Sequence, residues 1–376
     1  MTGPSRPRLR LGRVLLKALV LFLLLNALFA ALNPLDTLGR VSLYNALIPG
    51  RLRLPYGEVP QRANNLTLTN LPAMFASHLV AQPKAADEYR VILLGDSGIW
   101  GWLLDNPQTL AGRLNAAALR APDGRRVVVY NLGYPSLSLT KDLLLLDRAL
   151  ATDPDLVVWP MTLRALAPDQ QLATPLVQEN PAALRRLIHT HDLGLNPADP
   201  GLADPTFWER TIVGRRRPLA DLLRLQAYGV AWAATGIDQA PPLEVTPRQS
   251  DFEADLSWGD FTEPQPLTAD FLALDVVAAG VAQADPVPVL VVNEPIYRSS
   301  GQNSDLRYNA WYPRWAYDQY RALLGQTAAA GSWRYVDVWD AIPATQFSDS
   351  PVHLTPAGTA ALAERLIPHL RVAMEP

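Results

Sequence analysis

Two segments far apart in the sequence contain the residue types of nucleophilic catalysis. Ser97 follows a short apolar run that ends in Gly-Asp-Ser, whereas Asp349 and His353 lie together near the other end of the chain, just before a predicted helix. A serine hydroxyl is a weak nucleophile that needs a base, and the base needs a third group to orient it. His353 can supply the base and Asp349 the orienting carboxylate. These residues indicate acyl transfer through an activated serine.

Short apolar segments that alternate with helix-like stretches must position these residues. Strands are predicted at Tyr89–Leu94, Arg126–Asn131, Leu156–Trp159, Val287–Val292 and Arg334–Val338, and helices at Thr109–Leu119, Thr140–Ala151, Ala316–Ala330 and Pro356–Leu370. The strands are rich in valine and do not alternate with polar residues, which is typical of strands covered on both faces. The pattern predicts a three-layer α/β sandwich with a central, mostly parallel five-stranded sheet. Ligands bind at the carboxyl ends of such strands, and the first predicted strand ends just before Ser97.

Other residues are expected at the same edge of the sheet. Gly133 follows the second strand and can offer a backbone N–H to an oxyanion, or it is a plain turn glycine. Asn293 and Glu294 lie at the tip of the fourth strand and are candidates for substrate binding. The alternative for Glu294 is a structural ion pair with an arginine such as Arg298 or Arg314.

Together these segments resemble the SGNH (GDSL-type) hydrolase family, with its flavodoxin-like sheet. In that family the nucleophilic serine follows the first strand, a glycine follows the second, an asparagine follows the third, and the histidine lies late in an Asp-x-x-His motif. The resemblance covers Tyr89 to Leu163 and Val287 to Leu370. It implies that Ser97 is the nucleophile, Gly133 an oxyanion donor and His353 the base.

The chain departs from the family pattern after the third strand. In place of Gly-x-Asn it reads Trp-Pro-Met-Thr-Leu-Arg, so the oxyanion asparagine is missing. Thr162 in this stretch is the candidate replacement, although its hydroxyl is less rigidly aimed than an amide. Losing one such donor costs about 2.7–4 kcal/mol of transition-state stabilisation in a protease.

A second departure concerns the acid. Asp349 lies four residues before His353 instead of three, and Ser350 occupies the family position. We expect Pro351 to bulge the loop so that Asp349 still reaches the imidazole. If it does not, a backbone carbonyl must orient the histidine, with Asp337 and Asp340 as weaker reserves.

The N-terminal region predicts a membrane anchor. Leu15 to Leu32 is almost wholly apolar, and four arginines precede it at positions 6, 8, 10 and 13. A spanning helix needs about 17–25 apolar residues, and clustered arginines favour the cytoplasmic side. The rival interpretation is a cleaved signal peptide. We therefore expect a cell-membrane protein with a single span, a cytoplasmic N-terminus and an extracytoplasmic body.

The sequence pattern divides the chain into three parts. Residues 1–34 form the basic arm and anchor, 35–88 a juxtamembrane linker, and 89–375 the hydrolase-like domain, in which 165–284 is a large insertion or lid. The linker from Leu35 to Leu54, with its interleaved leucines and arginines, lies along the membrane surface or is an ordinary connection.

Composition excludes several classes of function. Up to Arg62 there are nine Lys and Arg against two acids, which gives +7; because the whole chain carries −3, the remainder carries −10. A mildly acidic body argues against nucleic acid as a partner. The chain has no cysteine, which excludes disulfides, thiolate metal sites and cysteine nucleophiles. The sequence implies no metal and no organic cofactor, and the scarcity of lysine suggests a bacterial source.

The function that these features favour is a serine esterase acting outside the membrane on O-acyl esters of envelope glycans or lipids. One alternative is an O-acyltransferase of cell-surface polysaccharide. Another is a catalytically impaired module for glycan binding or envelope assembly, which the missing asparagine and the displaced aspartate favour. The expected partners are an ester substrate and the lipid bilayer.

Overall fold

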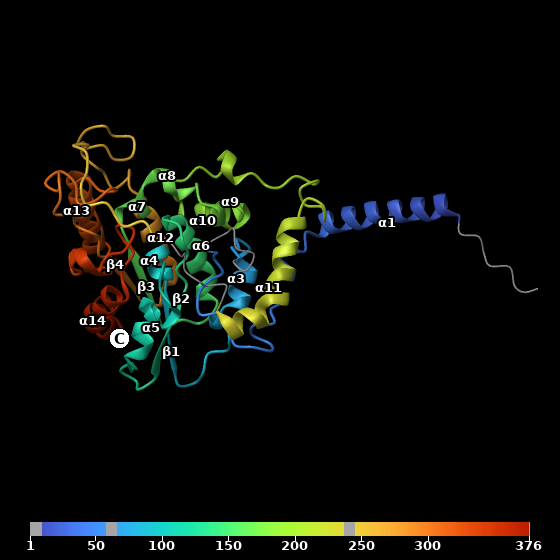
Figure 1. Cartoon of the computed structure of the whole chain (residues 1–376), viewed down its shortest axis with the longest axis horizontal. Coiled ribbons are helices and arrows are strands. Elements are labelled where there is room, and N and C mark those ends of the chain that lie inside the picture. The colour runs from blue at the N-terminus through green and yellow to red at the C-terminus, as the bar shows by residue number, and fades with distance from the viewer. Residues whose placement is uncertain (1–9, 58–65, 237–244, 376) are drawn as a thin grey trace, which may run out of the picture.

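The computed structural model describes residues 10–57, 66–236 and 245–375, and its centre is a parallel sheet of five strands. The strands are β1 (Glu88–Leu93), β2 (Arg126–Asn131), β3 (Leu156–Met161), β4 (Val289–Asn293) and β5 (Arg334–Asp337). They lie in the order β2-β1-β3-β4-β5, and every neighbouring pair is parallel (Figure 1). The predicted strands are confirmed, with small shifts at their ends.

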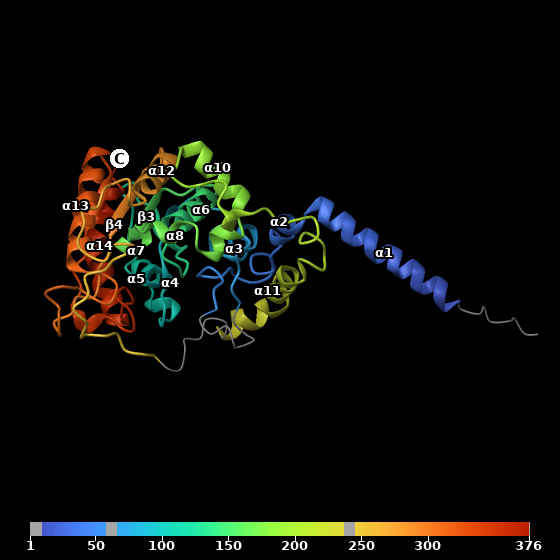
Figure 2. The same cartoon turned by 90° about the horizontal axis from the view of Figure 1, so that it is seen from above.

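Helices cover both faces of the sheet (Figure 2). One face packs on α5 (Leu110–Ala116) and α14 (Pro356–Ala373); the other packs on α6 (Leu139–Leu150), α12 (Leu274–Ala284) and α13 (Arg314–Ala330). Successive strand residues alternate between the two cores, as Ile92 and Leu93 do, because side chains of a strand point to opposite faces. The three-layer α/β sandwich is therefore confirmed. Thr355 caps α14 by accepting the N–H of Gly358, as the sequence predicts.

The strand order creates a switch point between β1 and β3. From β1 the chain crosses to the edge strand β2, and it then returns to β3 on the other side of β1. Crevices for ligands form at the carboxyl ends of strands where the order reverses. Ser97 follows β1 and Thr162 follows β3, so both lie at this position.

The apolar N-terminal stretch forms α1 (Leu11–Leu32), which projects away from the body (Figures 1 and 2). Within the described residues, α1 is the one helix long and apolar enough to cross a membrane, a test that a signal sequence also passes. The expected cytoplasmic arginines at positions 6 and 8 lie outside the described residues. The following linker packs onto the body, where Tyr44, Arg53 and Leu54 are buried.

Several short helices and one long helix connect the linker, β1 and β3 to the rest of the fold. They are α2 (Leu35–Gly39), α3 (Leu71–Ser77), α4 (Ser97–Trp100), α7 (Leu163–Leu166), α8 (Pro168–Gln171), α9 (Pro175–Gln178), α10 (Pro181–His191) and α11 (Arg216–Thr235). The predicted insertion 165–284 contains α8 to α12. Its last helix, α12, packs against α6 in the core, so this part of the insertion belongs to the layer that covers the sheet.

Candidate active site

The turn after β1 fixes Ser97 at the carboxyl edge of the sheet. Gly95 in this turn has φ +134°, and a Cβ atom there would lie 2.6 Å from Cγ1 of Ile99, so the turn requires glycine. The carboxylate of Asp96 accepts the backbone N–H of Gly98 at 2.8 Å and caps α4. Ser97 is the first residue of that helix, and its position is therefore set by the backbone on both sides.

The structure brings Ser97, His353 and Asp349 into one hydrogen-bonded chain. Oγ of Ser97 lies 2.7 Å from Nε2 of His353, and Nδ1 of His353 lies 2.8 Å from Oδ1 of Asp349. In this arrangement the serine donates to Nε2, while the protonated Nδ1 donates to the carboxylate. Burial opposes ionisation of Asp349, but hydrogen bonds from His353 and Ser348 outweigh it and lower the pKa of this carboxyl.

The loop before α14 explains how Asp349 reaches the imidazole in spite of its spacing. Oγ of Ser350 accepts the backbone N–H of His353 at 3.1 Å, which folds the loop back on itself. The carbonyl of Pro351 accepts the N–H of Tyr297 at 2.7 Å and ties the bulge to the loop after β4. Ser350, which stands where the family pattern has its acid, thus supports the turn. Asp349, one residue earlier, contacts His353.

Aromatic side chains line one side of the histidine. The indole of Trp102 stacks on the ring of His353, with 5.8 Å between ring centroids and 25° between planes. Tyr56, from the linker, contacts Trp102, Trp100 and Tyr134 edge-on, with centroids 5.4–6.3 Å apart. The sequence analysis missed this wall. Trp102 lies five residues after Ser97, which is a usable signal, whereas no local sequence pattern links Tyr56 to the site.

Gly133 lies beside α4, the helix that begins with Ser97, but its backbone N–H already has an acceptor. It donates to Oδ1 of Asn131 at 3.0 Å. A Cβ atom on Gly133 would lie 2.6 Å from the backbone nitrogen of Trp100, so close packing of the two turns requires a glycine here. To donate to an oxyanion, the N–H of Gly133 would first have to break its hydrogen bond with Asn131.

Thr162 is also engaged with another group. It is fully buried, and its hydroxyl donates to the phenol oxygen of Tyr312 at 3.2 Å, which also accepts the N–H of Arg164. Among the described residues, the backbone N–H of Ser97 has no acceptor, because it is the first N–H of α4. The N–H of Gly133 and the hydroxyl of Thr162 are both engaged, so the Ser97 N–H is the donor that the local hydrogen bonding leaves available.

Asn293 lies at the tip of β4 but is fully buried. Its amide nitrogen donates to Asp337 at 2.9 Å, and its oxygen accepts the hydroxyls of Tyr317 and Tyr320 at 3.3 and 3.0 Å. These bonds occupy the amide oxygen that would accept a substrate hydroxyl. The structure therefore places Asn293 in a buried network that joins β4, β5 and α13.

Glu294 is buried as well, and neither expected arginine pairs with it. Arg298 and Arg314 donate to backbone carbonyl groups elsewhere, and Oε1 of Glu294 has no hydrogen-bond partner among the described residues. Burial raises the pKa of Glu294 well above its usual value, and the nearby carboxyls of Asp96 and Asp142 raise it further. These surroundings favour the neutral acid.

Lys141 holds together the turns that follow β1 and β2, next to Ser97. Its fully buried ammonium donates to the carbonyls of Gly95 at 2.7 Å and Tyr134 at 3.1 Å, and it pairs with Asp142 at 2.6 Å. It thus connects the turns after β1 and β2 from within α6. The sequence analysis missed this role, although a Lys-Asp pair in an otherwise leucine-rich helix is a signal that could have found it.

No family model and no curated protein sequence matches the chain. Solved structures with similar folds include a lipase/acylhydrolase from Enterococcus faecalis, which is 14% identical with a TM-score of 0.38, over 76% of this chain and 97% of that one. An aryl esterase from M. smegmatis is 13% identical with a TM-score of 0.36, over 76% and 99%. A carbohydrate acetylesterase from Sinorhizobium meliloti is 14% identical with a TM-score of 0.34, over 75% and 98%. The chemistry of this chain has to be inferred from its own residues.

Proposed function

We propose that this protein is a serine-dependent acyl hydrolase that cleaves O-acyl esters. Ser97 is the nucleophile, His353 the general base and Asp349 the carboxylate that orients it. The observation that carries the proposal is the unbroken hydrogen-bonded chain from Oγ of Ser97 to Oδ1 of Asp349. A module that had lost catalysis would have no need of this arrangement at the switch point of the sheet.

The reaction follows from the geometry. Oγ of Ser97 attacks the ester carbonyl while Nε2 of His353 takes its proton, and the ionised Asp349 stabilises the imidazolium. The imidazolium then gives that proton to the leaving alcohol, and the C–O bond to the alcohol breaks. Water attacks the acyl-serine with His353 again acting as base. The second product is a carboxylic acid, and Ser97 is restored.

The oxyanion receives the backbone N–H of Ser97 as its donor. A second donor requires either that Gly133 releases Asn131 or that Thr162 turns from Tyr312. One oxyanion donor is worth about 10²–10³ in kcat in a protease, so a site with a single donor is a slow esterase on unactivated esters. We therefore expect activated esters to be cleaved more readily.

The proposed location is the outer face of a cell membrane. The 22 residues of α1 span about 33 Å at about 1.5 Å per residue, enough for a hydrocarbon core of about 30 Å. Contacts with the body at Asn26 and Ala30 support a retained anchor over a cleaved signal. The arginines of the N-terminal arm keep the N-terminus in the cytoplasm, so the body lies outside the membrane. The ester substrates of the body are then O-acyl groups on envelope glycans or lipids.

A second candidate reaction is transfer of the acyl group to a sugar hydroxyl. The observation that favours it is the aromatic wall of Trp102 and Tyr56 beside His353, because aromatic rings stack on sugars and keep water away. The acyl-serine would be the same, and the acceptor hydroxyl would replace water. Product analysis with an added alcohol separates the two reactions: transfer yields a new ester in place of the free acid.

Fluorophosphonate labelling of the full chain in detergent tests the proposal. We expect wild-type protein to be labelled at Ser97, and Ser97→Ala and His353→Ala to lose the label. Ser257→Ala is the matched control, because Ser257 is half-buried and its side chain bonds only Asp255, two residues earlier, among the described residues. A folded wild-type protein that takes no label would contradict an activated serine.

A further inference from the structure

Helix α11 has two apolar stripes, and only one of them packs against the body. Its inner stripe, Leu222, Leu225, Gly229 and Trp232, is buried. Its outer stripe repeats the helical spacing with Leu223, Ala227, Val230 and Ala234, all of which are exposed. Leu223 is 70% exposed and Val230 53%. A solvated surface helix would carry polar residues on this face.

The helix is fastened to the segment of chain that leaves α1. Gln226 accepts the backbone N–H of Leu43 at 2.7 Å and donates to the carbonyl of Val41. Gly229 admits the ring of Tyr44, since a Cβ there would lie 2.9 Å from it. α11 is therefore held next to the C-terminal end of α1, which we call its foot, and it runs crosswise to α1 in Figure 1.

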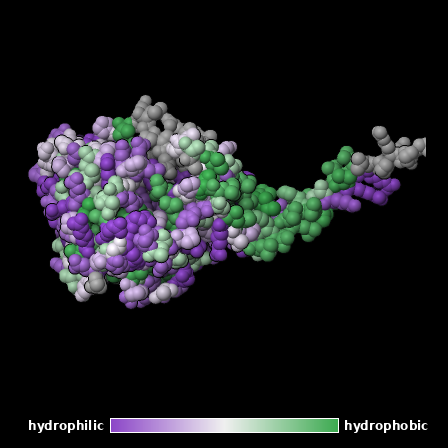
Figure 3. Space-filling view, turned by 90° about the horizontal axis from the view of Figure 1, so that it is seen from below, coloured by the Kyte–Doolittle hydropathy of each residue, from purple (hydrophilic) through white to green (hydrophobic). Residues whose placement is uncertain are grey.

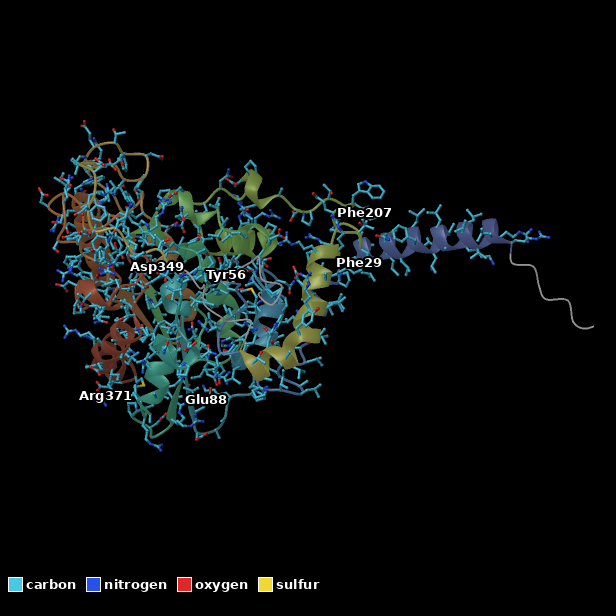
Figure 4. The ribbon with its side chains drawn as sticks, viewed as in Figure 1. Phe29, Tyr56, Glu88, Phe207, Asp349 and Arg371 are labelled. Carbon is cyan, nitrogen blue, oxygen red and sulfur yellow. The ribbon has the colours of Figure 1, made fainter. Side chains whose placement is uncertain are left out.

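The loop before α11 touches α1 itself. The backbone N–H of Val213 donates to the side-chain oxygen of Asn26 at 3.2 Å, and Asn26 lies six residues before the end of α1. That distance is about 9 Å along the helix axis. If all 22 residues of α1 span the bilayer, Asn26 lies below the lipid headgroups, so this loop reaches at least the level of the headgroups. Figure 4 shows Phe207 and Phe29 where the C-terminal end of α1 meets the body.

The same loop carries exposed aromatic rings, and it leads into α11, which carries exposed arginines. Trp208 is 76% exposed and Phe207 41% exposed, and the two rings meet edge-on at 5.6 Å. Exposed arginines follow at positions 216, 217 and 224. Tryptophan at the headgroup level with arginine beside it is typical of protein surfaces at a membrane interface. Figure 3 shows apolar residues continuing from α1 onto the adjoining end of the body.

We propose that the loop 207–213 and the outer stripe of α11 lie against the lipid bilayer beside α1. This membrane face is a second contact with the bilayer, in addition to the span. It prevents the body from swinging freely about the foot of α1, and so holds the catalytic domain in one orientation above the lipid. The inference rests on the proposed anchoring by α1 and is independent of the chemistry at Ser97.

Single-cysteine labelling tests this proposal directly, because the natural chain has no cysteine. The full chain is prepared as Trp208→Cys and Leu223→Cys, each carrying an NBD fluorophore, and placed in vesicles of phosphatidylcholine and phosphatidylglycerol. Leu23→Cys in the middle of α1 reports insertion of the span. Val372→Cys is the matched control, since Val372 is an apolar residue that is 66% exposed, next to Arg371 on the side of the body away from α1 (Figure 4).

We expect blue-shifted emission and loss of fluorescence with brominated lipid at positions 208 and 223, and neither at position 372. If position 23 is quenched while 208 and 223 behave like 372, the proposed membrane face is wrong and the anchor stands. If position 23 is not quenched, anchoring fails and the membrane face fails with it. Protection of 208 and 223 from aqueous iodide without quenching by brominated lipid would indicate a protein partner and would also overturn the proposal. Fluorophosphonate labelling of the same samples reports the serine chemistry separately.

Discussion

The indole of Trp102 stacks on the imidazole of His353, with the ring planes 25° apart and the centroids 5.8 Å apart. The same imidazole bonds Ser97 through one nitrogen and Asp349 through the other. The hydrogen bonds fix the two nitrogens of the His353 ring, and the stack with Trp102 restrains the plane of that ring. Trp102 acts on the proposed reaction through His353, as a positioning residue.

We expect Trp102→Ala to lower kcat for p-nitrophenyl acetate by about 10-fold, because misplacement of a catalytic group by about 1 Å can cost up to about 100-fold. Trp102→Phe keeps a flat ring over the histidine and should restore most of kcat. Steady-state kinetics measure both variants. Equal kcat in wild type and Trp102→Ala would show that the stack has no part in positioning His353.

Asp349→Asn should abolish most of the activity without unfolding the protein. A neutral amide cannot stabilise the charge of the imidazolium, and its NH2 group can donate to Nδ1 and so hold His353 in the wrong tautomer. In serine proteases the corresponding change lowers kcat by about 10⁴, and we expect a loss of about 10³–10⁴. Asp340→Asn is the matched control, because Asp340 is exposed and lies outside the hydrogen-bonded chain. Comparable losses of kcat in Asp349→Asn and Asp340→Asn would contradict the role of Asp349 in orienting His353.

The strands and the turn that carries Ser97 could be predicted because their sequence signals are local. Strands β1 to β4 each contain a run of at least three apolar residues, and Gly95, Asp96 and Ser97 are adjacent in sequence. The pairing of Ser97 with His353 was expected from the residue types and from the resemblance to the SGNH pattern, in which the serine follows the first strand and the histidine lies late in the chain. The spacing of Asp349 could not be decided in advance, because it depends on a hydrogen bond from a backbone N–H to the side chain of Ser350.

The surroundings of Glu294 were not predictable from nearby sequence. Arginines close in the chain were the natural candidates, but the structure sets Glu294 among Asp96, Asp142 and Lys141, which come from other elements. The oxyanion donors are a similar case. Gly133 and Thr162 lie after the expected strands, yet their hydrogen bonds to Asn131 and Tyr312 depend on side chains outside the family pattern.

Glu294 should make the protein less stable as the pH rises. Its pKa is raised in the folded protein by burial and by Asp96 and Asp142, so the folded state binds this proton more tightly than the unfolded state. Its contribution to stability is complete below the unfolded pKa of about 4.3, and it is lost as the pH rises towards the folded value, by up to about 1.4 kcal/mol per pH unit.

Glu294→Gln removes this titration while keeping the shape of the side chain. We expect its Tm to fall less than that of wild type between pH 5 and pH 8, as measured by differential scanning fluorimetry. Glu364→Gln on the exposed face of α14 is the control and should follow wild type. Parallel Tm curves for Glu294→Gln and wild type would mean that Glu294 is already ionised at pH 5.

Lys141→Met should destabilise the protein by about 3–5 kcal/mol, because it leaves the buried carboxylate of Asp142 without its cation. The carbonyls of Gly95 and Tyr134 lose their donor as well, so the turn that carries Ser97 loosens. The double variant Lys141→Met/Asp142→Asn removes the stranded charge and keeps an acceptor for the indole N–H of Trp159. Urea denaturation should find the double variant more stable than Lys141→Met alone. If the two variants were equally unstable, the lost hydrogen bonds to the carbonyls, and not the ion pair, would account for the effect of Lys141.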